Sequence, residues 1–221
     1  MQNIDLKPVL NFLDELKDHN NKAWFDKNRA EYETAKEHFE NFVDGLIGEL
    51  GKVEKLGGIT AKDCVMRIYR DIRFSKDKSP YRTNMGASIA PGGKKSMRLG
   101  YYLHLAPHGE SMAAGGMHMP EPAQLAKFRK AIDRNAKPFK AVINNKDFKQ
   151  YFGTLDGEKL KSASQGYDRE HPEVELLRLK EIVAVQRLPD TKVLSADFGS
   201  QVVKAFIAMK PFLDYLNSVI A

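Results

Sequence analysis

Hydrophobic residues in the first fifty positions recur three or four residues apart, which is the spacing of one helix face. This spacing predicts a first helix near residues 6–16. It predicts a second, longer helix that begins at Asn20 or Asn21, either of which can cap it, and that continues to Leu50.

From residue 64 the pattern changes to alternation of apolar and polar residues, which is typical of β-strands. We expect strands over 64–74, 84–90, 99–105 and 111–119, joined by short turns. Strands connected in this way form an antiparallel sheet. In the first of them the apolar residues, including Phe74, are expected on the buried side.

Helical spacing returns after the strands, and one more short strand is expected at 182–188. Ser195 is expected to cap the last helix, whose apolar stripe starts at Phe198, and Pro211 is expected to kink or split it. Because helices, strands and helices follow in separate blocks, the order predicts an α+β fold. We expect an antiparallel sheet of about four or more strands, flanked by N-terminal and C-terminal helices. We find no repeat and no linker, so residues 1–221 are expected to form a single domain.

Composition narrows the class of protein without naming an activity. Hydrophobic residues make up 42% and charged residues 29% of the chain, which excludes a disordered or fibrous protein. The single cysteine, Cys64, excludes an intramolecular disulfide and a cysteine-rich zinc site. The N-terminal residues show no signal-peptide pattern, and no stretch is apolar enough to span a membrane, so a cytoplasmic protein without a membrane partner is expected. The sequence specifies neither a cofactor nor an oligomeric state.

The positive charge is concentrated in one part of the chain. Residues 67–98 carry nine Lys and Arg against two Asp, a net charge of +7, whereas the whole chain has a net charge of +6. A protein that coats nucleic acid would spread its charge more evenly. The excess therefore indicates one local site that attracts a negatively charged partner.

Small residues occupy central positions on the expected polar face of the sheet, and arginines lie at its margins. Gly86, Gly100 and Gly116 fall on this face if the strands alternate as expected. Glycine is often kept where a group must approach the backbone closely, and the arginine fork binds two oxygens of a carboxylate or phosphate. The pattern predicts a shallow anion pocket with a glycine floor and a wall of Arg, His and Tyr.

The candidate ligand-binding residues belong to this face and to the loop after the first expected strand. They are Arg67, Arg70, Asp71, Arg73, Lys76, Lys78, Tyr81, Arg82, Arg98, Tyr102, His104 and His118. Arg70 falls on the side expected to be buried, so it needs a carboxylate from a packed helix, or a bulge that turns it elsewhere. The loop 75–82 is expected to fold over the anion.

Local motifs name no catalytic or metal site. Gly93 and Lys94 are followed by Lys95, not by the Ser or Thr that a phosphate loop needs. Three histidines, His104, His108 and His118, lie around one hairpin, but histidines in turns are more often exposed than metal ligands, so no metal site is predicted.

Three functions are compatible with these features. The leading hypothesis is binding of a small anionic ligand, with a phosphate compound as the first candidate and hydrolase or transferase chemistry as the reaction if there is one. A second is single-stranded nucleic-acid binding, in which Tyr69, Tyr81 and Tyr102 stack on bases. A third is a docking module for an acidic partner. The sequence does not decide whether the protein is an enzyme.

Several stretches, spread in order over most of the chain, resemble a known protein family. The longest is RIYRDIRFSKDKSPY at 67–81, with NKAWF at 21–25, GYYL at 100–103 and the segment 166–180 around it. They resemble a family of mostly bacterial proteins catalogued as domain of unknown function 2461. The resemblance implies one α+β domain and supplies no activity, cofactor or catalytic residue.

Overall fold

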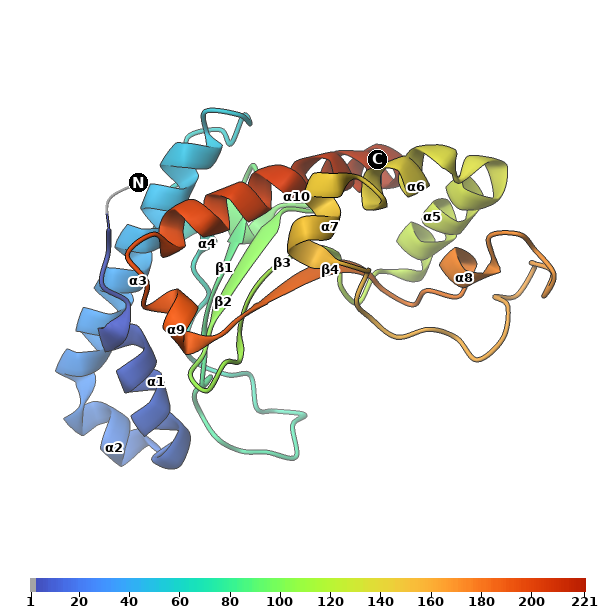
Figure 1. The fold of residues 1–221 in the computed structure, drawn as a ribbon. Helices are drawn as coiled ribbons and strands as arrows, with labels where there is room; N and C mark the ends of the chain where they lie inside the picture. Colours follow the sequence, from blue (N-terminus) through green and yellow to red (C-terminus); the bar gives the residue numbers. More distant parts are fainter. Residues whose placement is uncertain (1–2) are drawn as a thin grey trace. The chain divides into compact units, whose positions relative to one another are not determined.

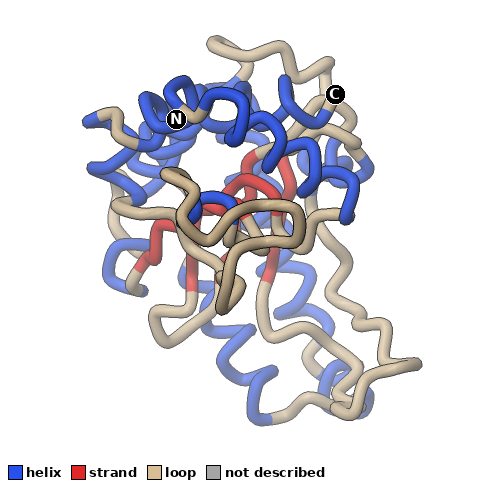
Figure 2. The backbone as a smooth tube through the Cα atoms, turned by 90° about the vertical axis from the view of Figure 1, so that its right-hand side faces the viewer, coloured by secondary structure: helices blue, strands red, loops and turns tan. Residues whose placement is uncertain are grey.

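Four strands form one antiparallel sheet, and helices lie before the first strand, between the third and the fourth, and after the fourth in the chain (Figure 1). The computed structural model describes residues 3–221. The strands, in spatial order, are β1 (Met85–Ile89), β2 (Tyr101–Leu105), β3 (Ser111–Met117) and β4 (Ile182–Leu188). Figure 2 shows them as neighbouring red segments. The predicted α+β fold is confirmed.

The register of β1 against β2 confirms the alternation expected for this part of the sheet. Met85 pairs with Leu105, and Ile89 pairs with Tyr101. The odd-numbered residues of β2 are buried, whereas Tyr102 and His104 are half-buried on the opposite face. The sheet therefore has one face that belongs to the core and one that is partly open.

The N-terminal helices differ from the expected pair at one point. They are α1 (Lys7–Asp18), α2 (Lys22–Lys27), α3 (Arg29–Leu50) and the short α4 (Ala61–Cys64). The single long helix expected from residue 20 or 21 is two helices that meet at Asn28. Asn21 caps α2, because its side-chain oxygen accepts a hydrogen bond from Trp24 N at 3.0 Å. Asn28 donates from its side chain to the Trp24 carbonyl at 2.8 Å, which ends that helix.

Of the remaining helices, one lies between β1 and β2, four lie between β3 and β4, and two follow β4 in the described part of the chain. They are η1 (Gly93–Lys95), α5 (Pro122–Asn135), α6 (Lys137–Ile143), α7 (Lys146–Phe152), α8 (Val174–Leu177), α9 (Asp190–Val193) and α10 (Phe198–Ile220). Pro211 lies inside α10 and does not split it. Within residues 3–221, no helix combines the length and the apolar character needed to cross a membrane.

The strand expected over 64–74 is wrong. Cys64 closes α4, and after it the chain makes only single-residue bridges at Val65 and Tyr69 (teal loop, Figure 1). Phe74, expected in the core, is 96% exposed. The physical reason is that residues 70–79 bond among themselves, through the Arg70 side chain, instead of to a neighbouring strand.

The chain divides into two compact units, which we describe separately. Unit 1 holds the residues up to 97 together with 101–113 and 187–204, and unit 2 holds 98–100, 114–186 and 205–221. That the whole chain is one domain stays a prediction.

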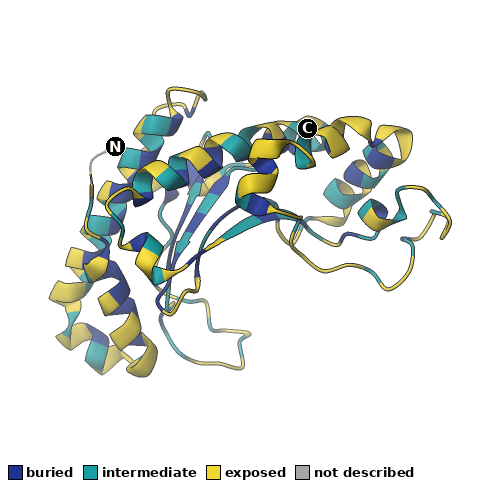
Figure 3. Ribbon diagram, viewed as in Figure 1, coloured by how far each residue is buried: buried dark blue, intermediate teal, exposed yellow. Residues whose placement is uncertain are grey.

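The core of unit 1 lies along the inner side of α3. Phe39, Phe42 and Leu46 are fully buried there, and the Phe42 ring stacks on Phe198 with centroids 5.3 Å apart. Figure 3 shows buried positions along one side of α1 and α3 and exposed positions along the other. Each such buried side chain contributes about 1.5–3 kcal/mol to stability, so α3 is held by this stripe.

The core of unit 2 is an aromatic cluster. Phe139 packs edge-on against Phe128 at 5.1 Å, and Phe148 lies 5.3 Å from Phe212 between ring centroids. All four rings are buried. Phe212 belongs to α10, so the second half of that helix is fixed by this cluster.

Glycines on the sheet make room for the protein's own groups. A Cβ on Gly86 would lie 2.8 Å from the Tyr102 hydroxyl. A Cβ on Gly116 would lie 2.2 Å from the Ile182 carbonyl oxygen, and Gly116 has a φ of +121°. Close approach therefore does explain these glycines, but the approaching groups are a tyrosine ring and a neighbouring backbone, so they do not form a floor for a ligand.

We expect Gly116→Ala to lower the free energy of unfolding by about 3 kcal/mol or more, because φ strain and a clash with backbone add together. Gly109→Ala is the matched control, since Gly109 has a φ of +73° and no atom within 4 Å of an added Cβ. It should cost only about 1–2 kcal/mol. Urea unfolding of both variants makes the comparison, and equal losses would contradict the role of the Ile182 contact.

Candidate functional site

A hollow of about 560 Å³ in unit 1 gathers cationic side chains from distant parts of the chain. Its cations are Lys36, Arg67, Arg82, Lys94 and Lys95. Among its lining residues within 3–221, Glu40 is the one carboxylate, and Tyr32 and Tyr69 add hydroxyl groups. We call this site the basic hollow.

Two extended stretches running side by side place Arg67 and Arg82. Met66 N donates to the Gly86 carbonyl at 2.8 Å, and Arg82 N donates to the Ile68 carbonyl at 2.8 Å. These bonds tie the chain after α4 to the chain before β1. The two arginines therefore lie on adjacent backbones although fifteen positions separate them in the sequence.

Tyr81 anchors the second of these stretches. Its side chain is 4% exposed, and its ring stacks on Phe25 with centroids 4.0 Å apart and an interplanar angle of 12°. The Asn20 side chain donates to the Tyr81 carbonyl at 3.0 Å and accepts from Tyr81 N at 3.1 Å. Asn20, one of two expected helix caps, thus serves as a backbone partner instead.

Lys94 and Lys95 reach the basic hollow because η1 packs closely on α4. Gly93 has a φ of +65°, and a Cβ there would lie 2.4 Å from the Asp63 carbonyl oxygen. The Lys94 ammonium donates to the Lys62 carbonyl at 2.7 Å. Only glycine allows this approach without a shift of the backbone.

No carboxylate is hydrogen-bonded to the arginines of the basic hollow in the described part of the chain, although Arg67 and Asp71 attract each other electrostatically. Within residues 3–221, the guanidinium groups of Arg67 and Arg82 form no hydrogen bond and no ion pair. Lys36 lies 3.8 Å from Glu40, a weak pairing for one of five cations. Like charges gathered in a concave site raise the local concentration of anions.

Arg70 has a partner that the sequence did not reveal. It donates to the carboxylate of Asp77 and, at 3.1 Å, to the Ser79 carbonyl. Asp77 also accepts from Ser79 N at 2.8 Å and from the Ser79 hydroxyl at 2.7 Å. The Ser79 hydrogen bonds, followed by that of Arg70, lower the pKa of Asp77 to about 2. The partner therefore comes from the loop itself, and neither a packed helix nor a bulge is involved.

The same loop neutralises Arg73. Its guanidinium donates to both oxygens of Asp71, at 2.9 and 2.6 Å, and this hydrogen bonding lowers the pKa of the carboxyl group. Lys78 donates to the Ile72 carbonyl at 3.0 Å. Lys76 is exposed on this loop.

A second hollow, of about 430 Å³, adjoins the basic hollow. It is lined by Arg70, Asp71, Asp77 and Tyr81, and it shares Arg82 and Asn84 with the basic hollow. Its two carboxylates, Asp71 and Asp77, already form ion pairs with Arg73 and Arg70, so these charges are largely neutralised within the protein.

Four other candidate residues do not line the basic hollow, although the charge of Arg82 acts on the pKa of one of them, Tyr102. The Tyr102 hydroxyl is 3.4 Å from Nδ1 of His104, and burial raises the pKa of Tyr102 and lowers that of His104. Arg98 and His118 belong to unit 2, where Nδ1 of His118 is 3.0 Å from the Glu181 carboxylate. Of the predicted set, the basic hollow brings together only Arg67 and Arg82.

Sequence reasoning missed three cations of the basic hollow. Lys94 and Lys95 were counted in the charged segment but not placed at a site, and their closeness to Arg67 depends on the packing of η1. The sequence could not predict that Lys36 lies at the site, because lysines are common on the exposed faces of helices. Within residues 3–221, no three His, Cys, Asp or Glu side chains come together to hold a metal ion.

We expect Asn20→Ala to lower the free energy of unfolding by about 1–3 kcal/mol, because it leaves the backbone groups of Tyr81 without their partners. Asn11→Ala, at an exposed position of α1, should change it by less than about 0.5 kcal/mol. Chemical denaturation measures both. Equal stability of the two variants would show that the Asn20 bonds do not hold the segment.

The low pKa of Asp77 makes its contribution depend on pH. Its folded pKa of about 2 lies below the usual value of 3.8, so its stabilisation is present above pH 4 and is lost as the pH falls towards 2. We expect Asp77→Asn to be less stable than the wild type at pH 7, and the difference to shrink between pH 4 and 2. A constant difference over that range, measured by urea unfolding, would contradict this assignment.

Comparison with known proteins gives one match. No match was found among curated proteins or among solved structures. Residues 8–215 match the sequence profile of a family described as "Conserved hypothetical protein (DUF2461)". The match covers nearly the whole chain, including α1, the 65–84 segment, the sheet and most of α10. The chain therefore belongs to the DUF2461 family of conserved hypothetical proteins.

Proposed function

We propose that the basic hollow binds a small anionic ligand that carries a phosphate group. The proposal keeps the anion specificity expected from the charge distribution but moves the site. The ligand would lie between the 65–69 segment, α3 and η1, and not on the open face of the sheet.

The observation that carries the proposal is the contrast between two pairs of arginines. Arg70 and Arg73 each bond to an aspartate of their own loop. Arg67 and Arg82, within the same stretch of chain, have no such partner within residues 3–221. Two guanidinium groups that line one hollow and bond to no carboxylate fit the several oxygens of a phosphate group.

Size and hydrogen-bonding capacity also favour a small ligand. A volume of about 560 Å³ is in the range of small-molecule sites. Burial raises the pKa of Tyr32 to about 12, so its hydroxyl stays protonated and can donate to a ligand oxygen. A concave, walled site favours a ligand over a flat docking surface for an acidic protein.

Single-stranded nucleic acid fits the structure less well. Of the three tyrosines expected to stack on bases, Tyr81 is buried against Phe25 and Tyr102 is half-buried against Gly86. Only Tyr69, 46% exposed, lines the basic hollow with a ring that a base could reach. Extended contact with several bases would need more than one such ring.

We expect phosphate-bearing metabolites, tested as a panel by thermal shift and calorimetry, to include a ligand that stabilises the protein. Arg67→Ala and Arg82→Ala should each weaken its binding about tenfold or more, because a hydrogen bond to a charged group is lost. Arg73→Ala is the matched control and should bind as the wild type does, since Arg73 already bonds to Asp71.

Two outcomes would contradict the proposal. One is that no phosphate compound shifts the melting temperature of the wild type. The other is that Arg73→Ala weakens binding as much as Arg67→Ala. If instead oligonucleotides bind, with an affinity that falls steeply with salt, and phosphate compounds do not, nucleic acid is the partner.

A further inference from the structure

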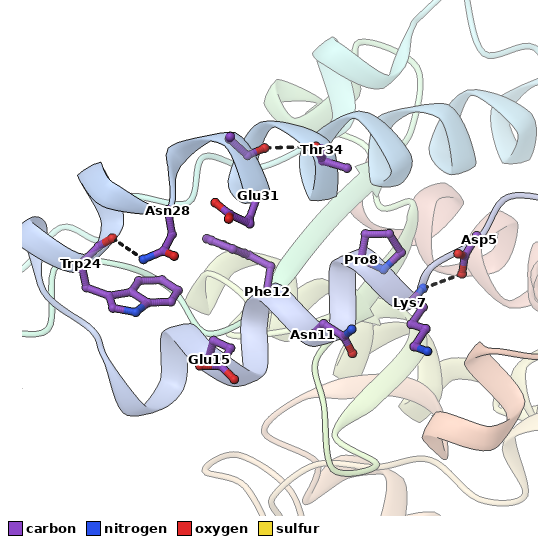
Figure 4. A pocket seen from close by; sticks show the side chains of 11 residues that line it. Asp5, Lys7, Pro8, Asn11, Phe12, Glu15, Trp24, Asn28, Glu31 and Thr34 are labelled. Carbon is purple, nitrogen blue, oxygen red and sulfur yellow. Dashed lines mark hydrogen bonds between the residues drawn. The ribbon is translucent and has the colours of Figure 1, made fainter.

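A different hollow in unit 1, of about 730 Å³, is lined by three carboxylates, Asp5, Glu15 and Glu31, and by one cation, Lys7 (Figure 4). It lies among α1, α2 and α3. Figure 4 shows Phe12 between Glu15 and Glu31, with the Trp24 indole beside them. All four residues line the hollow.

The hollow has an aromatic wall whose rings pack on one another. The rings of Phe12 and Trp24 lie 5.9 Å apart between centroids, and Phe12 also contacts Phe25 at 6.1 Å and Tyr32 at 5.6 Å. His19 stacks on Trp24 at 5.7 Å. Phe12 is buried and Trp24 is half-buried, so the indole provides the accessible aromatic surface.

The carboxylates at this wall are not neutralised by the protein. Glu15 and Glu31 are exposed and form no side-chain hydrogen bond or ion pair within residues 3–221. Farther along α3, Glu33 and Glu40 each lie within 4 Å of Lys36. Glu15 and Glu31 therefore bring two unpaired carboxylates to the hollow, in a protein whose net charge is +6.

We propose that this hollow binds a small organic cation, namely a substituted ammonium compound with an apolar group. An ammonium held over the face of a tryptophan is attracted by the negative face of the ring, and the two carboxylates add charge attraction from either side. The apolar group of the ligand packs on the rest of the wall. The volume is in the range of small-molecule sites.

The tryptophan at the site provides the measurement, because Trp24 is the single tryptophan of the chain. The probe is benzyltrimethylammonium, titrated at constant ionic strength while Trp24 fluorescence is recorded. We expect a saturable change in emission. Benzyl alcohol, which has the ring but no charge, should produce no saturable change at the same concentrations.

Variants connect the signal to the carboxylates. Glu15→Gln and Glu31→Gln should each weaken binding about three- to fivefold, as expected for loss of one charge near the ammonium across partly hydrated space. Glu37→Gln, at an exposed position of α3 that does not line the hollow, should bind as the wild type does. A variant with both Arg67→Ala and Arg82→Ala should also bind normally, which separates this proposal from the proposed anion site.

Three results would overturn the proposal. They are the absence of saturation, equal binding of benzyl alcohol, and unchanged affinity in both glutamate variants. A lysine-rich peptide that changes Trp24 emission when benzyltrimethylammonium does not would also overturn it, because the hollow would then recognise a macromolecule.

Discussion

Docking of Tyr81 is the contact on which the candidate site depends. The ring of Tyr81 stacks on Phe25 from α2, and the Asn20 side chain bonds to both backbone groups of Tyr81. The segment on either side of Tyr81 belongs to no strand and is held by isolated bridges and single backbone hydrogen bonds, such as that from Arg82 N to the Ile68 carbonyl. Backbone hydrogen bonds place the Arg82 stretch beside the Arg67 stretch, and the docking of Tyr81 fixes both against the N-terminal helices. The aromatic core of these helices therefore helps to position the basic hollow.

Charge in the 65–84 segment is divided between structure and binding. Arg70 and Arg73 bond to Asp77 and Asp71, and these bonds give an otherwise irregular loop its shape. Exposed ion pairs of this kind add little stability each, but they fix where the remaining charges lie. The net charge of the segment therefore overstates the charge available to a ligand. The cations that remain act together only because Lys94, Lys95 and Lys36 join them from other elements.

Helices and strands with a regular apolar pattern over many residues were predicted correctly, whereas the structure of the irregular 65–84 segment was not. The helical stripes along α1 and α3, and the alternation in β2, correspond to real buried faces. The alternation of apolar and polar residues over 64–74 predicted a strand that does not form, because a strand also needs a neighbouring strand to pair with. Instead, the side chain of Arg70 bonds to residues 77 and 79 and closes the chain into a loop. Glycines were rightly associated with close approach, but the identity of the approaching group, such as the Ile182 carbonyl at Gly116, is a matter of packing.

The sequence by itself determined the α+β class, the antiparallel sheet, the family and the concentration of positive charge in one segment, because each depends on local periodicity, composition or residue order. Only the tertiary structure decided which arginines are neutralised, which lysines join them, and that an acidic aromatic hollow lies elsewhere in unit 1. The physical reason is that an ion pair or a cavity depends on distances between side chains. Those distances arise from contacts such as Tyr81 on Phe25, which residue order does not specify.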